Sequence, residues 1–289
     1  GKTICTLPNV DSVFNIPNTI LRCTPDTKFL ILEMSVEYLG EMDFYLWLAK
    51  PDIGVVTNVF PTHLQFFDDE KGVAKEKGKL VSNLSSNGFA ILNSNNIHTK
   101  NMAKITKARV IYFDVNEDPI TTNSNAARKV AEIFKVPENL ITKGLKNYEN
   151  PKHRLFQFKH KSGSYILDDT YNSNPEATLS TLKVFNKLAK GNKKIAVLGD
   201  MLELGKLEER EHRRVGREVL KLKFDVVIGV GKLSRYLIDE VNNSNCKTYN
   251  VDSQEEVLPI LLPLLSKNTY VLIKGSRSIG LDKVIDKLL

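Results

Sequence analysis

The stretch YILDDTYNSNPEA (165–177) indicates how this chain is built. A short apolar run leads into two aspartates, a polar loop follows, and Pro175 stands where a helix would begin, because proline fits the first helical turn. A buried strand followed by a polar loop and a helix is typical of α/β proteins, which bind ligands at the carboxyl ends of their strands. Because the loop also holds a tyrosine and two asparagines, we interpret it as a ligand loop rather than a plain turn.

The same order of elements recurs on both sides of this stretch. Apolar runs alternate with segments of helical period, which predicts an α/β fold with parallel sheets flanked by helices. Before the stretch, we expect buried strands at 28–34, 53–59, 88–93 and 108–113 and helices near 40–49, 70–84 and 124–135. After a hairpin turning at Ser162-Gly163, we expect strands near 194–198, 225–230, 246–251 and 270–274.

A polar segment with a proline, KNYENPKHR (146–154), separates the two series of elements and is typical of a linker. A chain of 289 residues is long enough for two hydrophobic cores. We therefore predict two domains, 1–149 and 150–289, the second resembling a nucleotide-binding fold.

The composition is that of a globular protein, with 42% hydrophobic and 26% charged residues. The longest uncharged apolar stretch, 257–265, holds two prolines and is shorter than the roughly 20 residues that span a bilayer, so membrane insertion is not expected. Three cysteines, Cys5, Cys23 and Cys246, lie in no metal-ligand spacing, which favours the reduced cytoplasm.

The net charge of +7 raises the possibility of nucleic-acid binding. The lysines are spread along the chain without interleaved aromatic residues, and no nucleic-acid motif accompanies them. We interpret the charge as a solvated surface, and the nucleic-acid hypothesis ranks last; it predicts salt-sensitive binding to duplex DNA.

The chain opens with Gly1-Lys2-Thr3, the last three residues of a P-loop pattern. A P-loop needs an upstream glycine, a preceding strand and a following helix, whereas Pro8 and Pro17 here favour a loop. Because the chain also starts with glycine, we expect its true amino terminus to lie upstream.

Polar residues end two of the expected strands in the first domain. Glu33 follows one strand, and Asn58 and then His63 follow the next. Taken singly, each fits a strand-end ion pair or a surface residue. Since neighbouring strand ends meet at one edge of a sheet, together they indicate a metal site.

The second domain offers a larger set of polar strand ends. Arg154 follows the linker, and its planar guanidinium is suited to a phosphate across the interdomain cleft, although a linker ion pair is the plainer alternative. Asp168 and Asp169 end one strand. The segment YVLIKGSRS brings Lys274, Ser276 and Arg277, a set suited to a carboxylate or phosphate, with a solvated basic turn as the alternative.

Taken in order, LEMS, KPDIGVVTN, THLQFF, VAKEKGKL, ILNSN, PKHR, DDTYNSNPEA, VLGDMLELG and VLIKGSRS resemble the Mur ligase family of peptidoglycan synthesis over nearly the whole chain. DDTYNSNPEA with LGDMLELG and KGSRS is most similar to the members that add D-alanyl-D-alanine to a UDP-N-acetylmuramoyl tripeptide. The resemblance implies a cytoplasmic, monomeric ligase of cell wall biogenesis that uses ATP and Mg²⁺ and forms an acyl phosphate.

The resemblance also implies a fold and a truncation. We expect an incomplete P-loop-type ATPase domain with a parallel sheet, followed by a Rossmann-like carboxyl-terminal domain. Thr6, Asn9, Pro17 and Thr19 keep spacings that the family shows beyond its P-loop. Gly1-Lys2-Thr3 would then lie past the true phosphate loop, and this chain, lacking that loop and the domain that holds the UDP-sugar, would be inactive alone.

Site residues follow from the resemblance position by position. The expected magnesium site comprises Glu33, His63 and Lys77, the last matching a lysine that the family carbamylates. Lys77, His63 and Arg154 are the expected catalytic residues. The nucleotide is expected to contact Asn58, Arg154, Asp168, Asp169 and Tyr171. The dipeptide substrate is expected to contact Asn172, Asn174, Lys274, Ser276 and Arg277.

The chain departs from the family at Ser35, Gln65 and Lys79, and Thr121-Thr122 stands where the family has histidine and asparagine. Two alternatives stay open. One is another ligase of this architecture, such as a folylpolyglutamate or cyanophycin synthetase. The other is a homologue that binds a ligand or partner without catalysis.

Overall fold

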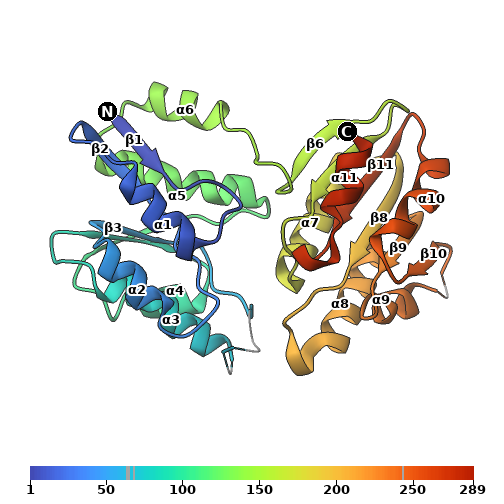
Figure 1. Ribbon diagram of the computed structural model, residues 1–289, viewed down its shortest axis with the longest axis horizontal. Coiled ribbons are helices and arrows are strands. Elements are labelled where there is room, and N and C mark those ends of the chain that lie inside the picture. Colours follow the sequence, from blue (N-terminus) through green and yellow to red (C-terminus); the bar gives the residue numbers. More distant parts are fainter. Residues whose placement is uncertain (63–65, 68, 243) are drawn as a thin grey trace. The chain divides into compact units, whose positions relative to one another are not determined.

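The computed structural model describes residues 1–62, 66–67, 69–242 and 244–289. It is an α/β structure, as predicted from the alternation of apolar runs and helical segments. The chain forms two compact units, Gly1–Tyr148 and Glu149–Leu289, here called unit 1 and unit 2 (Figure 1).

The described residues of unit 1 form five strands in two parallel groups. Strands β1 (Lys2–Cys5) and β2 (Thr27–Ile31) pair with each other, and β3 (Ile53–Val56), β4 (Phe89–Asn93) and β5 (Arg109–Phe113) form the second group. The helices are α1 (Ser12–Leu21), α2 (Glu41–Leu48), α3 (Glu70–Ser82), α4 (Ile97–Met102), α5 (Pro119–Ile133) and α6 (Glu138–Lys146). The strands and helices predicted from the apolar runs are all present.

The β3–β4–β5 sheet buries both of its faces, because successive side chains of a strand point to opposite sides. Ala90 and Leu92 of β4 belong to a core shared with α2 and α3. Ile91, between them, belongs to a second cluster with Phe113 and with Ala126 of α5. This two-sided burial explains why the strand sequences are continuously apolar.

Helix α1 corrects the expectation of a loop around Pro17. The helix runs through Pro17, with Asp11 capping it by accepting the Val13 N–H at 2.9 Å. Asn15 stabilises the preceding loop, because its Nδ2 donates to the Leu7 carbonyl at 2.7 Å. Ile16 is fully buried, so packing of the helix outweighs the hydrogen bond lost at proline.

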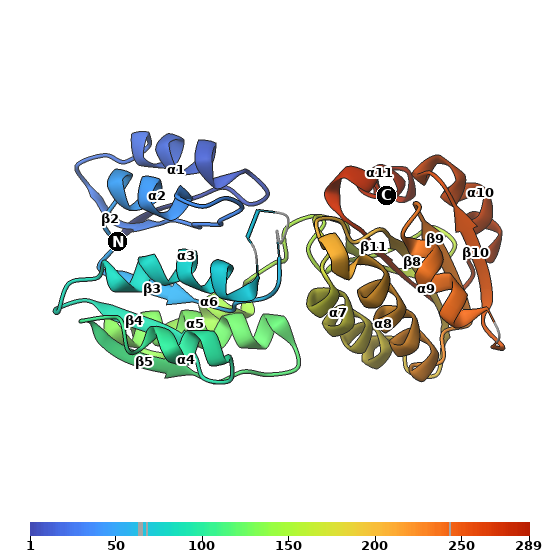
Figure 2. The same ribbon diagram turned by 90° about the horizontal axis from the view of Figure 1, so that it is seen from below.

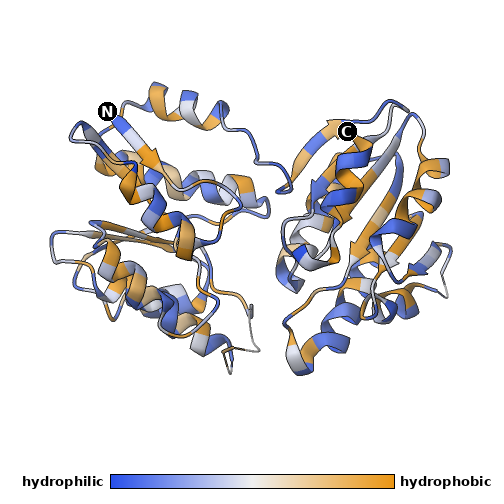
Figure 3. Cartoon of the chain, in the orientation of Figure 1, coloured by the Kyte–Doolittle hydropathy of each residue, from blue (hydrophilic) through white to orange (hydrophobic). Residues whose placement is uncertain are grey.

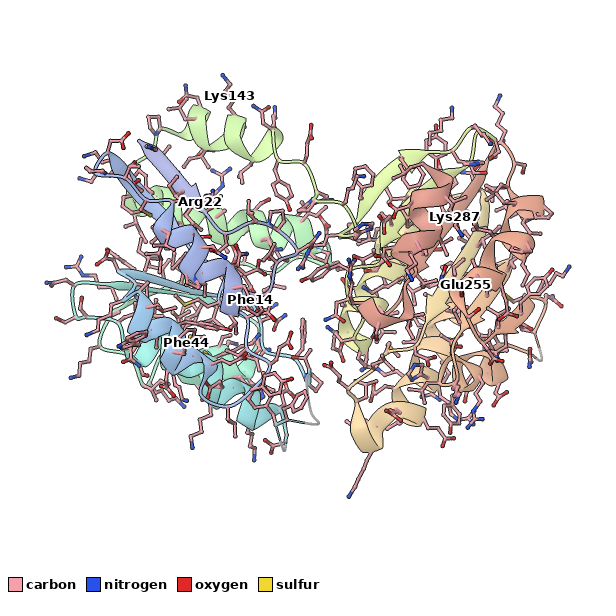
Figure 4. All side chains as sticks on the ribbon, in the orientation of Figure 1. Phe14, Arg22, Phe44, Lys143, Glu255 and Lys287 are labelled. Carbon is pink, nitrogen blue, oxygen red and sulfur yellow. The ribbon has the colours of Figure 1, made fainter. Side chains whose placement is uncertain are left out.

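Strand β2 corrects a second expectation, that of a buried strand. Leu30 and Ile31 are exposed, and β2 pairs with β1 alone among the described strands. Phe14 of α1 and Phe44 of α2 are also exposed and are labelled in Figure 4. One edge of β2 and one edge of β3 therefore lack a strand partner within the described residues.

Helices α2 and α3 are joined by a buried carboxylate. Glu76 of α3 is 1% exposed, and its Oε1 accepts the N–H groups of Gly40 and Met42 at 3.0 Å each. These groups start α2 and have no partner within that helix. Lys79 Nζ lies 2.7 Å from Glu76 Oε2 and 2.6 Å from Asp43 Oδ2. Glu76 thus fixes the position of α3 against α2.

We expect Glu76→Ala to lower the free energy of unfolding by about 1–3 kcal/mol, because the N–H groups of Gly40 and Met42 lose their acceptor. Urea unfolding followed by the fluorescence of Trp47, the single tryptophan of the chain, on α2, measures the change. The control is Glu132→Ala, which removes an exposed partner of Lys129 and should change stability by less than about 0.5 kcal/mol. Equal losses in the two variants would contradict the anchoring role of Glu76.

Unit 2 holds one six-stranded sheet in the order β10-β9-β8-β11-β7-β6. Its strands are β6 (Phe156–Lys159), β7 (Tyr165–Asp169), β8 (Lys193–Gly199), β9 (Val226–Val230), β10 (Lys247–Val251) and β11 (Thr269–Lys274). The first two form the predicted hairpin and are antiparallel, with Gly163 at φ +88° in the turn, and the other strand pairs are parallel. Parallel order brings the carboxyl ends of β7, β8, β9 and β11 to one edge.

Helices cover both faces of this sheet. Helices α7 (Pro175–Leu188), α8 (Glu208–Lys221) and α9 (Ser234–Val241) pack on the face that includes Leu167 and Leu272. Helices α10 (Val257–Leu261) and α11 (Asp282–Leu288) pack on the opposite face, with Ile166 and Val271 (Figure 2). The central strands between them are hydrophobic in their middle and carry polar residues at their ends (Figure 3). Such a rigid, two-sided core holds the loops at the strand ends in place.

Candidate active site

Glu33 lies just beyond β2 on a backbone that two side chains fix. Thr6 Oγ1 accepts the Glu33 N–H at 3.0 Å, and Ser12 Oγ donates to the Glu33 carbonyl at 3.0 Å. Ser35 lies 2.8 Å from Ser12, Oγ to Oγ, which accounts for a serine where the family has glycine. The Glu33 residue is exposed, so its carboxylate is accessible from the solvent at the end of the strand.

Asn58 follows β3 and belongs to a network of side-chain amides at the carboxyl ends of β3 and β4. Its Oδ1 accepts from Asn96 Nδ2 at 2.7 Å, and Asn93 Nδ2 donates to the Thr57 carbonyl at 2.8 Å. Asn93 and Asn96 were not predicted as site residues, although ILNSN is one of the motifs that carry the resemblance. A run of asparagines directly after a strand was the available signal.

Lys77 projects from α3 toward the end of β3. Its Nζ lies 3.4 Å from the Asn58 carbonyl oxygen, and it forms no ion pair with any residue that the structure describes. Burial lowers the pKa of the Lys77 ammonium below its ordinary value of 10.5. The neighbouring lysines differ, because Lys75 is exposed and Lys79 is paired with two carboxylates. Lys77 is thus the one of these three best suited to act as a neutral amine.

The lowered pKa of Lys77 predicts a pH dependence of stability. Below that pKa both the folded and the unfolded chain are protonated, and the fold bears the cost of a buried charge. Stability should therefore rise with pH between the lowered pKa and about 10.5. We expect Lys77→Met to be more stable than the parent at pH 7 and to lose this advantage as the pH approaches about 10.5. Urea unfolding across the pH range measures it.

The matched control is Lys75→Met, which changes an exposed lysine two positions away on the same helix. Its stability relative to the parent should not change with pH. An identical pH dependence in the two variants would contradict the burial of the Lys77 charge.

His63, predicted as a metal ligand, lies outside the described residues, as does Gln65. Among the residues that are described, no group of three or more histidine, cysteine, aspartate or glutamate side chains is arranged to hold a metal ion. Glu33 is the described carboxylate of the predicted metal site.

Thr121 and Thr122, which replace the family's histidine and asparagine, lie in the first turn of α5. Thr121 Oγ1 donates to Asp118 at 2.6 Å, and Thr122 Oγ1 donates to the Asn116 carbonyl at 3.0 Å. Both hydroxyls therefore serve the helix start.

In unit 2, a buried ion pair links the ends of β7 and β11. Lys274 is 2% exposed, and its Nζ lies 2.7 Å from Asp169 Oδ2 and 2.8 Å from the Asn172 carbonyl oxygen. Asp169 also accepts from Thr181 Oγ1 at 2.8 Å and from the Leu155 N–H at 3.2 Å. The pair fixes the loop after β7, and Lys274 has almost no surface left for a substrate.

Ser276 joins two further strand ends. It is 6% exposed, its Oγ accepts the Leu202 N–H at 3.0 Å, and its own N–H donates to the Asp200 carbonyl at 3.1 Å. Asp200 in turn accepts the Leu233 and Ser234 N–H groups at the start of α9, at 3.0 and 2.7 Å. Direct substrate contacts predicted for Lys274 and Ser276 do not fit this burial; both instead hold the loops that surround the site.

Asp168 also turns inward. It is fully buried, and its oxygens bond to His153 and Thr170, with Thr170 Oγ1 donating at 2.7 Å. Burial raises the pKa of the Asp168 carboxyl, and the Thr170 and His153 contacts oppose that rise. A direct nucleotide contact by Asp168, as predicted, does not fit a side chain without exposed surface.

The accessible groups at this edge surround Tyr171. The Arg154 guanidinium carbon lies 4.0 Å from the centre of the Tyr171 ring, and that of Arg277 lies 5.9 Å from it. Arg277, which also pairs with Asp282 at 3.1 Å, and Asn172 are both exposed. Two guanidinium groups beside one ring form a positive surface suited to a phosphate or carboxylate.

Asn174 has a structural role that is compatible with this surface. Its side chain caps α7 by accepting the Ala177 N–H at 2.9 Å, with Pro175 in the first turn as predicted. Arg154, Tyr171, Asn172 and Arg277 thus gather at the carboxyl edge of the unit 2 sheet. Asp168, Asp169, Lys274 and Ser276 form the layer beneath them.

Comparison with known families decides what these edges belong to. The Mur ligase middle domain matches residues 1–142, and the Mur ligase glutamate ligase domain matches residues 153–277. The chain belongs to the Mur ligase family. The predicted family and fold class are therefore confirmed, with the middle domain in unit 1 and the glutamate ligase domain in unit 2.

Individual relatives agree with this membership. The chain is 27% identical to the UDP-N-acetylmuramoyl-tripeptide--D-alanyl-D-alanine ligase of Buchnera aphidicola subsp. Baizongia pistaciae, over 100% of this chain and 70% of the relative. The crystal structure of MurF from Acinetobacter baumannii superposes with a TM-score of 0.88 at 22% identity, over 99% of this chain and 70% of that one. MurF ligase from Thermotoga maritima in complex with ADP superposes with a TM-score of 0.83 at 20% identity, over 99% and 73%.

None of the helices within the described residues has both the length and the apolar character needed to cross a membrane.

Proposed function

We propose that this Mur ligase chain takes part in joining D-alanyl-D-alanine to a UDP-N-acetylmuramoyl tripeptide with the consumption of ATP. The relative from Buchnera aphidicola is named for that activity, and its match spans 100% of this chain. The single structural observation that carries the proposal is the Arg154–Tyr171–Arg277 surface, a cationic site above a loop whose sequence, DDTYNSNPEA, resembles this branch of the family.

The proposed reaction has two steps. A carboxylate oxygen of the tripeptide attacks the γ-phosphorus of ATP, the bond to the bridging oxygen breaks, and ADP leaves with its electrons. The amine of D-alanyl-D-alanine then attacks the acyl carbon of the resulting acyl phosphate. The tetrahedral intermediate expels phosphate, which keeps one oxygen of the original carboxylate, and the amine nitrogen loses a proton. Both steps require the stabilisation of developing negative charge.

Residues of each unit have a part in this scheme. Arg154 would contact ATP phosphate oxygens, and Arg277 with Asn172 would bind the dipeptide, whose carboxylate suits an exposed guanidinium. Burial lowers the pKa of the Lys77 ammonium and so favours the neutral amine. The neutral amine would attack carbon dioxide and lose a proton to give a carbamate anion. Carbon-13 bicarbonate should then give a carbamate signal in the parent chain that Lys77→Met abolishes.

The residues of unit 1 fit Mg²⁺, which prefers oxygen ligands. Glu33 offers an exposed carboxylate on a fixed backbone, and a carbamate on Lys77 would add two more oxygens. When bound, Mg²⁺ would neutralise charge on the ATP phosphates. His63 stays a predicted third ligand.

We further propose that the 289 residues do not catalyse ligation alone. They contain no complete Gly-x-x-x-x-Gly-Lys-Ser/Thr loop, the backbone cradle that such an ATPase needs for its phosphates. The edges of β2 and β3 that lack partners among the described strands would accept a further strand leading into such a loop. We also propose that the protein acts in the cytoplasm and as a monomer. Analytical ultracentrifugation tests the monomeric state.

Release of phosphate from ATP tests the proposal in this chain and in a chain extended with the genomic residues before Gly1. Release by the extended chain should require both the muramoyl tripeptide and D-alanyl-D-alanine. Release that needs glutamate and a folate, or aspartate and arginine, would favour the folylpolyglutamate or cyanophycin alternatives. Tight binding of ATP without turnover on any amine would favour a non-catalytic homologue. Full activity of the 289 residues would contradict the proposed need for a phosphate loop.

A further inference from the structure

The corner that carries Arg154 has an unusual backbone. His153 and Leu155, the residues on either side of Arg154, have φ values of +69° and +51°. Side chains other than glycine rarely adopt this left-handed region, and such residues persist where the surroundings impose them. Two of them flank one residue here, and that residue is Arg154, a half-buried arginine in contact with Tyr171.

Consecutive aspartates of β7 hold this corner from below. Asp168 Oδ2 accepts the His153 N–H at 3.2 Å and lies 3.0 Å from His153 Nδ1. Asp169 Oδ1 accepts the Leu155 N–H at 3.2 Å. One carboxylate therefore binds the residue before Arg154, and the next binds the residue after it.

Further hydrogen bonds tie the same corner to its neighbours. The Tyr171 N–H donates to the His153 carbonyl at 2.9 Å, and Asn150 Nδ2 donates to the Leu155 carbonyl at 3.0 Å. The first of these also places Tyr171 next to the corner, so the ring and the guanidinium that contacts it share one framework. Hydrogen bonds to the backbone groups of His153 and Leu155 thus fix the chain on both sides of Arg154.

Among the described residues, Asp168 forms side-chain hydrogen bonds only with this corner and with the neighbouring Thr170. Its second oxygen, Oδ1, accepts the Thr170 N–H at 3.1 Å and the Thr170 hydroxyl at 2.7 Å, and the side chain has no exposed surface. Burying a carboxylate is costly unless its hydrogen bonds repay the lost hydration. The backbone pairing of β7 with β11 does not need an ionisable side chain at this position.

We propose that Asp168 and His153 are positioning residues for Arg154: they impose the left-handed corner that holds its guanidinium over Tyr171 before a ligand arrives. Holding a binding group in place in advance lowers the entropy lost on binding. The consequence for phosphate binding rests on the proposed function of Arg154, whereas the positioning itself does not.

The test uses the full 289-residue chain labelled with nitrogen-15. A guanidinium stacked on an aromatic ring has an upfield-shifted Arg154 Nε–H resonance, which reports its position directly. We expect His153→Ala and Asp168→Asn to move this resonance toward the value of Arg217, an exposed arginine of α8 with no aromatic ring contact among the described residues. His153→Asn should retain most of the shift, because asparagine tolerates positive φ and keeps a polar side chain. Titration with sodium tripolyphosphate should show affinity about tenfold lower for His153→Ala and for Asp168→Asn.

The control for general destabilisation is His160→Ala. His160 is buried in the β6–β7 turn, where its ring lies 2.9 Å from Ser162 Oγ, so the variant should lose stability without moving the Arg154 resonance. An unchanged Arg154 resonance in folded His153→Ala and Asp168→Asn overturns the proposal. If those variants do not fold, the parent chain decides: an Arg154 Nε–H as mobile in nitrogen-15 relaxation as that of the exposed Arg217 overturns it equally.

The phosphate-binding role of Arg154 can fail separately. Arg154→Ala that binds tripolyphosphate as tightly as the parent would contradict that role. The resonance of Arg154 in the His153 and Asp168 variants would still decide whether these residues position it.

Discussion

Replacing Lys274 by methionine should lower the free energy of unfolding of unit 2 by about 3–5 kcal/mol, because it leaves the largely buried Asp169 carboxylate without its countercharge. The Asn172 carbonyl, 2.8 Å from Lys274 Nζ, loses its donor in the same change. Native-state hydrogen exchange at the β11 amides Val271 and Leu272, which lie in the centre of the unit 2 sheet, measures the loss in that unit.

Two further variants show whether the charge itself is the cause. Lys274→Met combined with Asp169→Asn should be more stable than Lys274→Met alone, because the uncompensated charge is gone and asparagine can still accept the Leu155 N–H. Lys283→Met, at an exposed position of α11, should change stability by less than about 0.5 kcal/mol. A double variant no more stable than Lys274→Met would contradict the ion-pair explanation.

The second large effect is expected on activity. In a chain that carries the phosphate loop, Arg154→Ala should lower kcat for ligation by about 10²- to 10³-fold, the usual loss when one preorganised donor to a developing negative charge is removed. Arg154→Lys should recover only part of the rate, because an ammonium lacks the planar fork that faces a phosphate and stacks on Tyr171. Steady-state ligation with saturating D-alanyl-D-alanine measures both.

Arg235→Ala is the matched control, an exposed arginine of the same unit that contacts Tyr236 in a similar way, with its guanidinium carbon 5.0 Å from the ring centre. Its kcat should equal that of the parent. An Arg154→Ala variant with unchanged kcat would remove Arg154 from the proposed mechanism.

Much of the fold was predictable because strand and helix periods follow directly from burial. The core strands, such as β4, are apolar on both faces, so their residues alone indicate them. Helix α1 was not predictable in this way, since Pro17 favours a loop locally while the buried Ile16 and the Asn15 hydrogen bonds are tertiary effects. The exposure of β2 depends on which strand lies beside it, and a strand's own sequence does not state that.

The candidate site was predictable in place but not in detail. Strand ends bring polar residues to one edge, and the sequence identified Arg154, Tyr171 and Arg277 at that edge. It could not tell an outward side chain from an inward one: Asp168 and Lys274 look like ligand groups in the sequence, yet both are buried in hydrogen bonds with their neighbours. The left-handed corner at His153 and Leu155 likewise has little signal in residue type, because neither is glycine or asparagine.

The most direct test of the ligase account follows an oxygen atom. A chain that includes the phosphate loop is supplied with ATP, magnesium, D-alanyl-D-alanine and a UDP-N-acetylmuramoyl tripeptide whose terminal carboxylate carries oxygen-18. Mass spectrometry should find one oxygen-18 atom in the phosphate released for each amide bond formed, because that oxygen passes through the acyl phosphate. Amide formation with unlabelled phosphate, or ATP hydrolysis without an amide product, would contradict the account.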